Sequence, residues 1–317
     1  MIRIADSGEY LEKLRSLARP GEGNILAFHE HRTGLICRDP RLMLSPLDDH
    51  LTHRGDGVFE TIKYTEGRLY LLDEHLERMK GSADGIGLTP PCSWEDLRAA
   101  VLETAAAGKE KSGMMRILLG RGPGGFGIDP AECPESSLYL AAYRFTPPSP
   151  AWYEKGRSGF RTSIPAKQGY LAKLKNANYL PNVMMILEAK EKGMDTPFCF
   201  DEQGYLAESS VANLCLVDDA GVLTVPAFTN ALPGTTLLRA MDCVKDRLDI
   251  VTRKIREEEI YAAKEAILLG TGPDCVAVVS YEGKAIGSGK PGPVSSMLRE
   301  RIAADILEYG VPVPGLV

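Results

Sequence analysis

The chain has 317 residues, of which 44% are hydrophobic and 25% are charged, with a formal net charge of −6. These values are ordinary for a folded protein of about two domains, and they exclude collagen-like, low-complexity and small disulfide-scaffold classes. Because 43 acidic side chains outnumber 37 basic ones, the composition gives no support for a general binder of nucleic-acid backbones.

The cysteines and histidines narrow the chemistry further. Seven cysteines are scattered without a C-x-x-C pair, which favours free thiols in a reducing cytoplasm. No apolar signal-peptide core and no bilayer-spanning run occur, so we expect neither a secretion signal nor a membrane segment. All five histidines lie within the first 75 residues and no zinc-binding spacing is present. We therefore expect lysine, a carboxylate or a cofactor to carry any catalysis.

The first half of the chain has the patterns of an α+β domain. In chain order, the expected elements are a helix at 7–18, strands at 25–30, 34–38, 57–64 and 68–72, a helix opening at Asp73, a helix at 93–107, and strands at 114–120 and 137–145. Asp73 is expected to cap its helix, and Ser93 and Asp96 have the spacing of a capping box. The Pro-rich stretch 146–156 predicts an interdomain linker, which gives domains at 1–147 and 157–317 joined by 148–156.

The second half alternates hairpin-like strands with a few helices. The expected elements are an apolar-polar stretch at 160–166, a helix near 178–192 capped by Asn178, strands at 197–201, 205–208, 213–217 and 222–225, a helix at 235–247, strands at 264–270 and 275–281, and a helix at 292–308. Strands that come mostly in hairpins argue against a doubly wound fold.

Residues 120–125 match the glycine pattern of a dinucleotide-binding loop. That motif requires a helix to open directly after the glycines, with its N-terminus at the pyrophosphate. Pro130 argues against such a helix, and no convincing βαβ unit surrounds the match. We therefore interpret the stretch as a loop on the substrate side, and a nicotinamide dehydrogenase as an unsupported alternative.

Four other sequence features are each common in proteins when they are considered separately. Lys175 precedes a predicted helix, Glu208 follows a short strand, Arg78 lies four residues after Glu74, and Gly234 opens a predicted helix. Together, a lysine, a carboxylate, an arginine and a Gly-Thr helix start are the groups that pyridoxal phosphate requires, for its aldehyde, its pyridine nitrogen and its phosphate.

Five ordered motifs give the chain a specific resemblance. They are HRGDGVFETIKYTEGRLYLLDEHLERMKGSA (53–83), KNANYLPNVMMILEAKEKG (175–193), FDEQGYLAESSVANLCLV (200–217), ALPGTTLLRA (231–240) and LLGTGPDCVAVVSYEGKAIGSGKPGPV (268–294). From residue 25 to about 305, the chain resembles the class IV, or fold type IV, pyridoxal-phosphate aminotransferases. This family includes branched-chain aminotransferases, D-amino-acid aminotransferases and aminodeoxychorismate lyases. The resemblance implies a two-domain α+β fold, with a small N-terminal domain and a larger C-terminal domain whose barrel-like β-structure is flanked by helices.

The resemblance also implies a role for particular residues. Lys175 corresponds to the lysine that forms the Schiff base, and it is preferred over Lys173 because Asn178 follows three residues later. Glu208 corresponds to the partner of the pyridine nitrogen. The remaining implied cofactor contacts are Arg78, Thr235, Thr236 and Thr271 at the phosphate and Ser209, Ser210 and Asn213 along the flank; Phe59, Phe126 and Tyr179 are candidate substrate contacts.

The activity implied is amino transfer between an amino acid and a 2-oxo acid, with Lys175 moving the substrate proton. Glu60 and Phe126 favour a transaminase over the alternative, an aminodeoxychorismate lyase that releases pyruvate and 4-aminobenzoate. The spacing after Lys175 differs from the K-x-G-G-N-Y of branched-chain enzymes, whereas Phe126 stands where D-amino-acid enzymes have an arginine, so the donor and its handedness stay open. The family further implies a homodimer in which residues 50–54 or 122–130 approach the neighbouring site. A non-catalytic binder of pyridoxal phosphate remains a weaker alternative.

Overall fold

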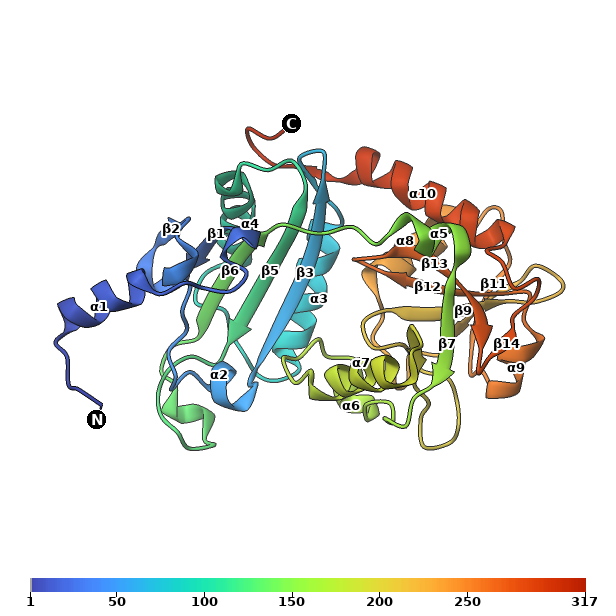
Figure 1. Cartoon of the computed structure of the whole chain (residues 1–317), viewed down its shortest axis with the longest axis horizontal. Helices are drawn as coiled ribbons and strands as arrows, with labels where there is room; N and C mark the ends of the chain where they lie inside the picture. Colours follow the sequence, from blue (N-terminus) through green and yellow to red (C-terminus); the bar gives the residue numbers. More distant parts are fainter. Residues whose placement is uncertain (1) are drawn as a thin grey trace. The chain divides into compact units, whose positions relative to one another are not determined.

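A computed structural model describes residues 2–317. The chain divides into two compact units of mixed α/β structure (Figure 1). The first comprises residues 2–69, 86–145 and 312–317, and the second comprises residues 70–85 and 146–311. None of the helices within residues 2–317 combines the length and apolar character that crossing a membrane requires.

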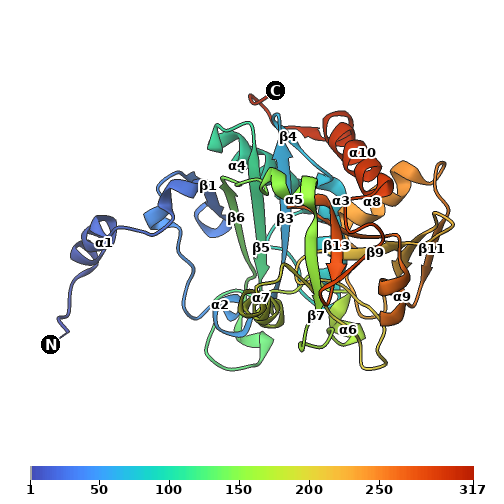
Figure 2. The ribbon, with the colours of Figure 1, turned by 45° about the vertical axis from the view of Figure 1, so that its right-hand side comes forward.

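The first unit is an antiparallel sheet with one long helix. Its elements are α1 (Ser7–Ser16), β1 (Ile25–Glu30), β2 (Leu35–Cys37), α2 (His50–Arg54), β3 (Gly57–Thr65), β4 (Arg68–Leu69), α4 (Trp94–Gly108), β5 (Gly113–Gly120), β6 (Ser137–Tyr143) and β15 (Val311–Pro312). The strand order is β15-β4-β3-β5-β6-β1-β2. Helix α4 packs on β1, β5 and β6 (Figure 2).

The long helix of this unit begins as its sequence predicts. The Ser93 hydroxyl accepts a hydrogen bond from the backbone N–H of Asp96, at 3.0 Å, which satisfies one of the free donors of the first turn. Leu97, Val101 and Ala105, spaced by four residues, then bury one face of α4 against the sheet. The observed bounds differ from the predicted helix by one residue at each end.

The second unit is built on a mixed sheet. Its elements are α3 (Leu72–Asp84), α5 (Pro150–Lys155), β7 (Arg157–Arg161), α6 (Gly169–Ala172), α7 (Leu180–Lys192), β8 (Thr196–Phe198), β9 (Asn213–Val217), β10 (Leu223–Pro226), α8 (Thr235–Val244), β11 (Ile250–Arg253), α9 (Glu257–Ala262), β12 (Glu265–Gly270), β13 (Asp274–Tyr281), β14 (Lys284–Ala285) and α10 (Pro293–Tyr309). The strand order is β11-β10-β9-β12-β13-β7-β8, with β14 paired to β13.

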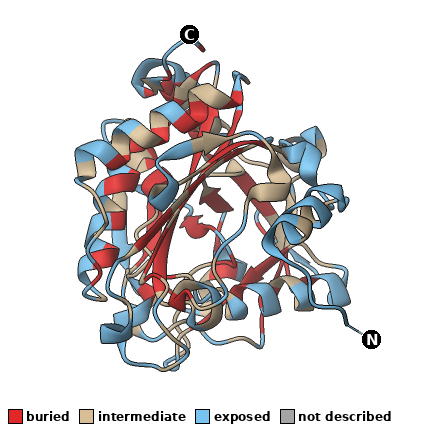
Figure 3. Ribbon diagram, turned by 90° about the vertical axis from the view of Figure 1, so that its left-hand side faces the viewer, coloured by how far each residue is buried: buried red, intermediate tan, exposed pale blue. Residues whose placement is uncertain are grey.

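Both faces of this sheet are buried, since two separate core clusters contain its residues. Figure 3 shows that strands of the protein consist largely of buried residues. On β12, Ile267 and Leu269 join a cluster with Leu237 of α8 and Leu298 of α10. The alternate residue Leu268 joins a second cluster on the opposite face. A central strand buried on both faces reads as a nearly continuous apolar run. This explains why the strands predicted from the sequence agree with β9, β12 and β13 to within one residue at each end.

Two helix starts differ from the sequence prediction. Asp73 is not a cap, because α3 begins at Leu72 and its capping residue Leu71 adopts a left-handed conformation with φ 57°. Asn178 is not a cap either: α7 begins at Leu180, and the backbone N–H of Asn178 instead donates to the side chain of Asn176 at 3.1 Å. The predicted strand at 205–208 is limited to isolated bridges at Tyr205 and Leu206. The apolar-polar stretch at 160–166 overlaps β7 only at its first two residues, because β7 ends at Arg161.

The division into units also differs from the domain boundaries expected from sequence. Residues 70–85 pack with the second unit, where the Tyr70 hydroxyl donates to buried Asp305 at 2.8 Å. Residues 312–317 pack with the first unit, where the backbone N–H of Val313 donates to Gly67 at 2.8 Å. Within the predicted linker, Ser149 caps the short helix α5. The local composition of residues 70–85 and 312–317 does not indicate which unit each segment joins, because contacts with residues distant in the sequence determine it.

Candidate active site

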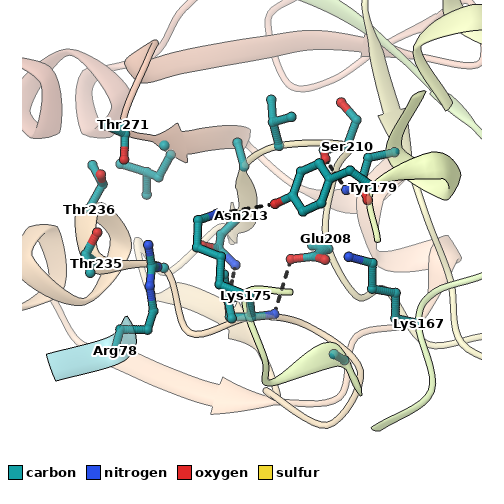
Figure 4. A pocket seen from close by; sticks show the side chains of 18 of the residues that line it. Arg78, Lys167, Lys175, Tyr179, Glu208, Ser210, Asn213, Thr235, Thr236 and Thr271 are labelled. Atoms are coloured by element: carbon teal, nitrogen blue, oxygen red, sulfur yellow. Dashed lines mark hydrogen bonds between the residues drawn. The ribbon is translucent and has the colours of Figure 1, made fainter. Parts of the chain in front are cut away.

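One pocket in the second unit gathers polar side chains from widely separated segments (Figure 4). The polar side chains that line it belong to Arg78, Lys167, Lys175, Tyr179, Asn182, Glu208, Ser210, Asn213, Thr235, Thr236 and Thr271. Apolar walls come from residues such as Leu174, Leu232 and Leu269. Eight of the polar groups were expected at a cofactor site; Tyr179 was expected at the substrate, and Lys167 and Asn182 were not expected at all.

Lys175 is held in the turn between α6 and α7. Its backbone N–H donates to the Ser82 hydroxyl on α3 at 3.1 Å, and its ammonium nitrogen lies 3.3 Å from the Tyr179 hydroxyl. The side chain of the following residue, Asn176, donates to two backbone carbonyls of the preceding turn. Of the two lysines considered from sequence, Lys175 lines this pocket, whereas Lys173 is exposed and lines a different hollow.

Glu208 is the acidic group of the pocket. Its carboxylate accepts a hydrogen bond from the backbone N–H of Leu232 at 3.2 Å. Burial raises the pKa of Glu208 to about 7, although that N–H and the charges of Lys167, Lys175 and Arg78 act in the opposite direction. Lys167 faces the carboxylate in Figure 4, and burial lowers the pKa of its own ammonium group. No local pattern in the sequence marks Lys167 as a site residue.

The loop 232–234, which leads into α8, is fixed from several sides. The Asn213 side chain donates to the carbonyl of Leu232 at 2.8 Å, and Arg78 donates to the carbonyl of Pro233 at 3.3 Å. A Cβ on Gly234 would lie 1.9 Å from the side-chain oxygen of Asn213, so only glycine allows this close approach. The first N–H groups of α8 have no partner within the helix, and they open at the pocket beside Thr235 and Thr236.

Three of the residues expected from sequence lie outside the pocket lining. Ser209 is buried, and its backbone N–H donates to the carbonyl of Ala212. Phe59 and Phe126 belong to the first unit; Phe59 is buried in β3 with the Arg116 guanidinium over its ring, and Phe126 is 64% exposed beside His53. The structure therefore gives no support to Ser209 as a wall of this pocket.

The glycine-rich stretch at 120–125 is a loop, as expected. β5 ends at Gly120, no helix opens directly after Gly125, and Pro130 begins a short 3₁₀ turn. Gly122 has φ 104°, and a Cβ there would lie 1.8 Å from the carbonyl oxygen of Glu135. Glycine at position 122 thus allows a tightly packed loop, and the stretch does not form the helix start that would bind a pyrophosphate.

The donor set of the pocket fits pyridoxal 5'-phosphate. Lys175 supplies an amine for an aldehyde, and Glu208 supplies a carboxylate for a pyridine nitrogen. Arg78 and the N-terminus of α8 supply a cation and backbone donors for a phosphate. Asn182 adds a buried side-chain oxygen without a hydrogen-bond partner, while its amide group donates to the carbonyl of Ser210.

Comparison with known proteins gives a family. The model of the class IV amino-transferases matches residues 57–281. A chloroplastic D-amino-acid transaminase of Arabidopsis thaliana is 32% identical over 96% of this chain and 82% of its own length. A putative branched-chain-amino-acid aminotransferase of Methanocaldococcus jannaschii is 26% identical over 84% of this chain and 92% of its own length.

Solved structures give the same answer. A T.th. branched-chain amino acid aminotransferase, solved with pyridoxamine 5'-phosphate, superposes with a TM-score of 0.83 at 25% identity, over 88% of this chain and 93% of that one. This similarity gives the chain fold type IV, as the sequence motifs implied. The chain belongs to the class IV aminotransferases, a family of enzymes that use pyridoxal 5'-phosphate.

Proposed function

We propose that this aminotransferase takes its amino group from D-amino acids and passes it to a 2-oxo acid, with Lys175 as the catalytic residue. The pocket that joins Lys175, Glu208 and Arg78 to the N-terminus of α8 is the observation that carries the assignment of roles. The D-series donor is supported by the 32% identity to a D-amino-acid transaminase and by the short Lys175–Asn178 spacing. The relatives reported above are aminotransferases, so the lyase alternative is not favoured.

Each residue of the proposal has a defined task. The bound cofactor supplies an electron sink for the pair released when the substrate Cα loses its proton. Lys175 Nζ would hold the cofactor through its aldehyde group and would move the proton of the substrate Cα. Glu208 holds a proton at the pyridine nitrogen. The phosphate cradle, defined as Arg78, Thr235, Thr236 and Thr271, binds the phosphate through charge, hydroxyl and backbone N–H groups.

Replacing Lys175 tests the central role. We expect Lys175→Ala to lose at least about a thousandfold in kcat, since covalent and proton-transfer catalysis disappear together. Lys173→Ala, two residues away and exposed, is the matched control and should retain full turnover. Borohydride reduction followed by peptide fragmentation should locate the cofactor on Lys175. Full turnover of Lys175→Ala, or a label on Lys173, contradicts the assignment.

The donor is tested in the half-reaction without an acceptor. D-alanine and L-leucine are added separately to the holoenzyme, and the loss of the visible absorbance of the bound cofactor is followed. Conversion by D-alanine and not by L-leucine supports the proposal, whereas the reverse result assigns the enzyme to the branched-chain group.

We also propose that the chain works as a homodimer. Helix α7 exposes Leu180, Val183, Met184 and Leu187, between 44% and 69%, at the spacing of one helical face. Single exposed apolar side chains are common, but an apolar stripe along one helix is typical of an interaction surface. Leu187→Glu should therefore shift the mass measured by sedimentation toward the monomer. Leu307→Glu, an equally exposed leucine on α10, is the control; a wild-type monomer with full activity contradicts the proposal.

The cytoplasm is the proposed compartment. All seven cysteines are free, which fits a reducing environment.

A further inference from the structure

A buried histidine outside the pocket lining contacts two of its members. His75 lies on α3, three residues before Arg78, and its side chain is almost completely buried at 1% exposure. Its Nδ1 lies 3.3 Å from Nη2 of Arg78, and its Nε2 lies 3.2 Å from the hydroxyl oxygen of Thr235 on α8. The imidazole thus bridges a cation and a hydroxyl that belong to different elements of the phosphate cradle.

The chemistry of the two partners fixes the direction of both hydrogen bonds. A guanidinium group can only donate, so Nδ1 of His75 accepts from Arg78. The ring proton of the neutral imidazole is then on Nε2, and it is donated to the Thr235 oxygen. Because that oxygen accepts from His75, the hydroxyl proton of Thr235 is directed toward another acceptor. Thr235 lines the pocket, where a phosphate oxygen is such an acceptor.

We propose that His75 is a positioning residue for cofactor binding, which orients the Arg78 guanidinium and the Thr235 hydroxyl together toward the phosphate. Arg78 also donates from Nη1 to the carbonyl of Pro233, directly before the glycine that opens α8. Arg78 is therefore held at both ends of its guanidinium group, by His75 and by the loop. Thr235 has a hydroxyl that rotates about one bond, and the hydrogen bond from His75 selects its orientation.

The proposal rests on the phosphate cradle of the proposed function, so its test compares two ligands of the apoprotein that differ only in the phosphate. His75→Phe keeps the ring but removes both hydrogen bonds. We expect its Kd for pyridoxal 5'-phosphate to rise about tenfold, as for the loss of one or two hydrogen bonds to charged or oriented groups. Its Kd for pyridoxal, which lacks the phosphate, should stay within twofold of the wild-type value.

Two further variants separate positioning from simple damage to the fold. His75→Gln places an N–H near the position of Nε2 and should recover part of the affinity for pyridoxal 5'-phosphate. In the double variant His75→Phe/Thr235→Val, the loss should be smaller than the product of the two single losses, because both changes remove the same hydrogen bond. Unfolding temperatures of all variants are measured in parallel.

The outcomes are distinct. A His75→Phe protein that binds pyridoxal 5'-phosphate like the wild type overturns the proposal, and so does one that loses both ligands equally. If the unmodified protein binds the phosphorylated ligand no more tightly than pyridoxal, the phosphate cradle itself fails. That result is seen without any change at His75 and is therefore separable from the role of the histidine.

Discussion

The ammonium group of Lys167 faces the carboxylate of Glu208 in the pocket that also contains Lys175 (Figure 4). The same ammonium lies 4.6 Å from the centroid of the Tyr179 ring, so it is placed by an aromatic face as well as by a charge. Lys167 lowers the pKa of Glu208, against the larger effect of burial. Lys167, which no sequence motif marks, thus favours the ionised form of Glu208, the carboxylate proposed to bind the pyridine nitrogen.

Removal of this cation should raise the pKa of Glu208. We expect Lys167→Met to shift it upward from about 7 by roughly one unit, because an opposite charge that favours the ionised form is lost. Carbon-13 NMR of the labelled Glu208 carboxyl, assigned with Glu208→Gln, measures the titration in the apoprotein. Lys167→Arg keeps the charge and should leave the pKa near its original value. An unchanged pKa in Lys167→Met would contradict the electrostatic coupling.

The raised pKa of Glu208 also predicts how the stability of the apoprotein depends on pH. In the folded state this carboxyl titrates near 7 rather than near 4.5, so the folded protein binds the extra proton between these values. The contribution of Glu208 to stability is therefore fully present below about pH 4.5 and is lost as the pH rises through 7. Glu208→Gln should remove this dependence and gain up to about 3 kcal/mol over the wild type at pH 8, from about 1.4 kcal/mol per pKa unit.

Unfolding of both apoproteins in urea at pH 5, 6, 7 and 8 measures that difference. If the free energy of unfolding depends on pH in the same way for the wild type and for Glu208→Gln, the pKa of Glu208 is not raised in the folded apoprotein, and the prediction is wrong.

Two glycine substitutions should have opposite effects. Gly234→Ala brings a Cβ to 1.9 Å from the Asn213 side chain, which must move and release the carbonyl of Leu232. We expect a loss of about 1–3 kcal/mol in stability and weaker cofactor binding. Gly81→Ala, on the exposed face of α3 with no atom within 4 Å of the new Cβ, should instead stabilise the helix by about 0.5–1 kcal/mol. Thermal unfolding compares the two; a tolerated Gly234→Ala would refute the role of this close approach.

The limits of the sequence prediction follow from the range of the interactions concerned. The Ser93 cap and the doubly buried strand β12 were correctly predicted, because both depend on residues within a few positions. The start of α3 was predicted wrongly, since Leu71 adopts a left-handed conformation that an apolar residue rarely takes. Motif resemblance named Lys175 and Glu208 as site residues, and the structure brings both to one pocket.

Other members of the site had no signal in the sequence. In the sequence, His75 resembles any other buried residue of an amphipathic helix. Its partner Thr235 lies 160 residues further along the chain. Lys167 is an isolated lysine in a loop, where a solvated side chain is the usual outcome. Only the folding of α3 and of loop 166–168 onto the second unit gives these residues a partner.

The chain passes from one unit to the other after residues 69, 85, 145 and 311. A chimaera made with a relative by exchange at the 145 boundary would therefore inherit Lys175 and Glu208 from one parent and Arg78 with His75 from the other. In this chain His75 contacts both Arg78 and Thr235, so we expect a hybrid that separates these residues to hold the cofactor poorly. A chimaera therefore needs two further crossovers, at 69 and 85, so that α3 comes from the same parent as the rest of the second unit.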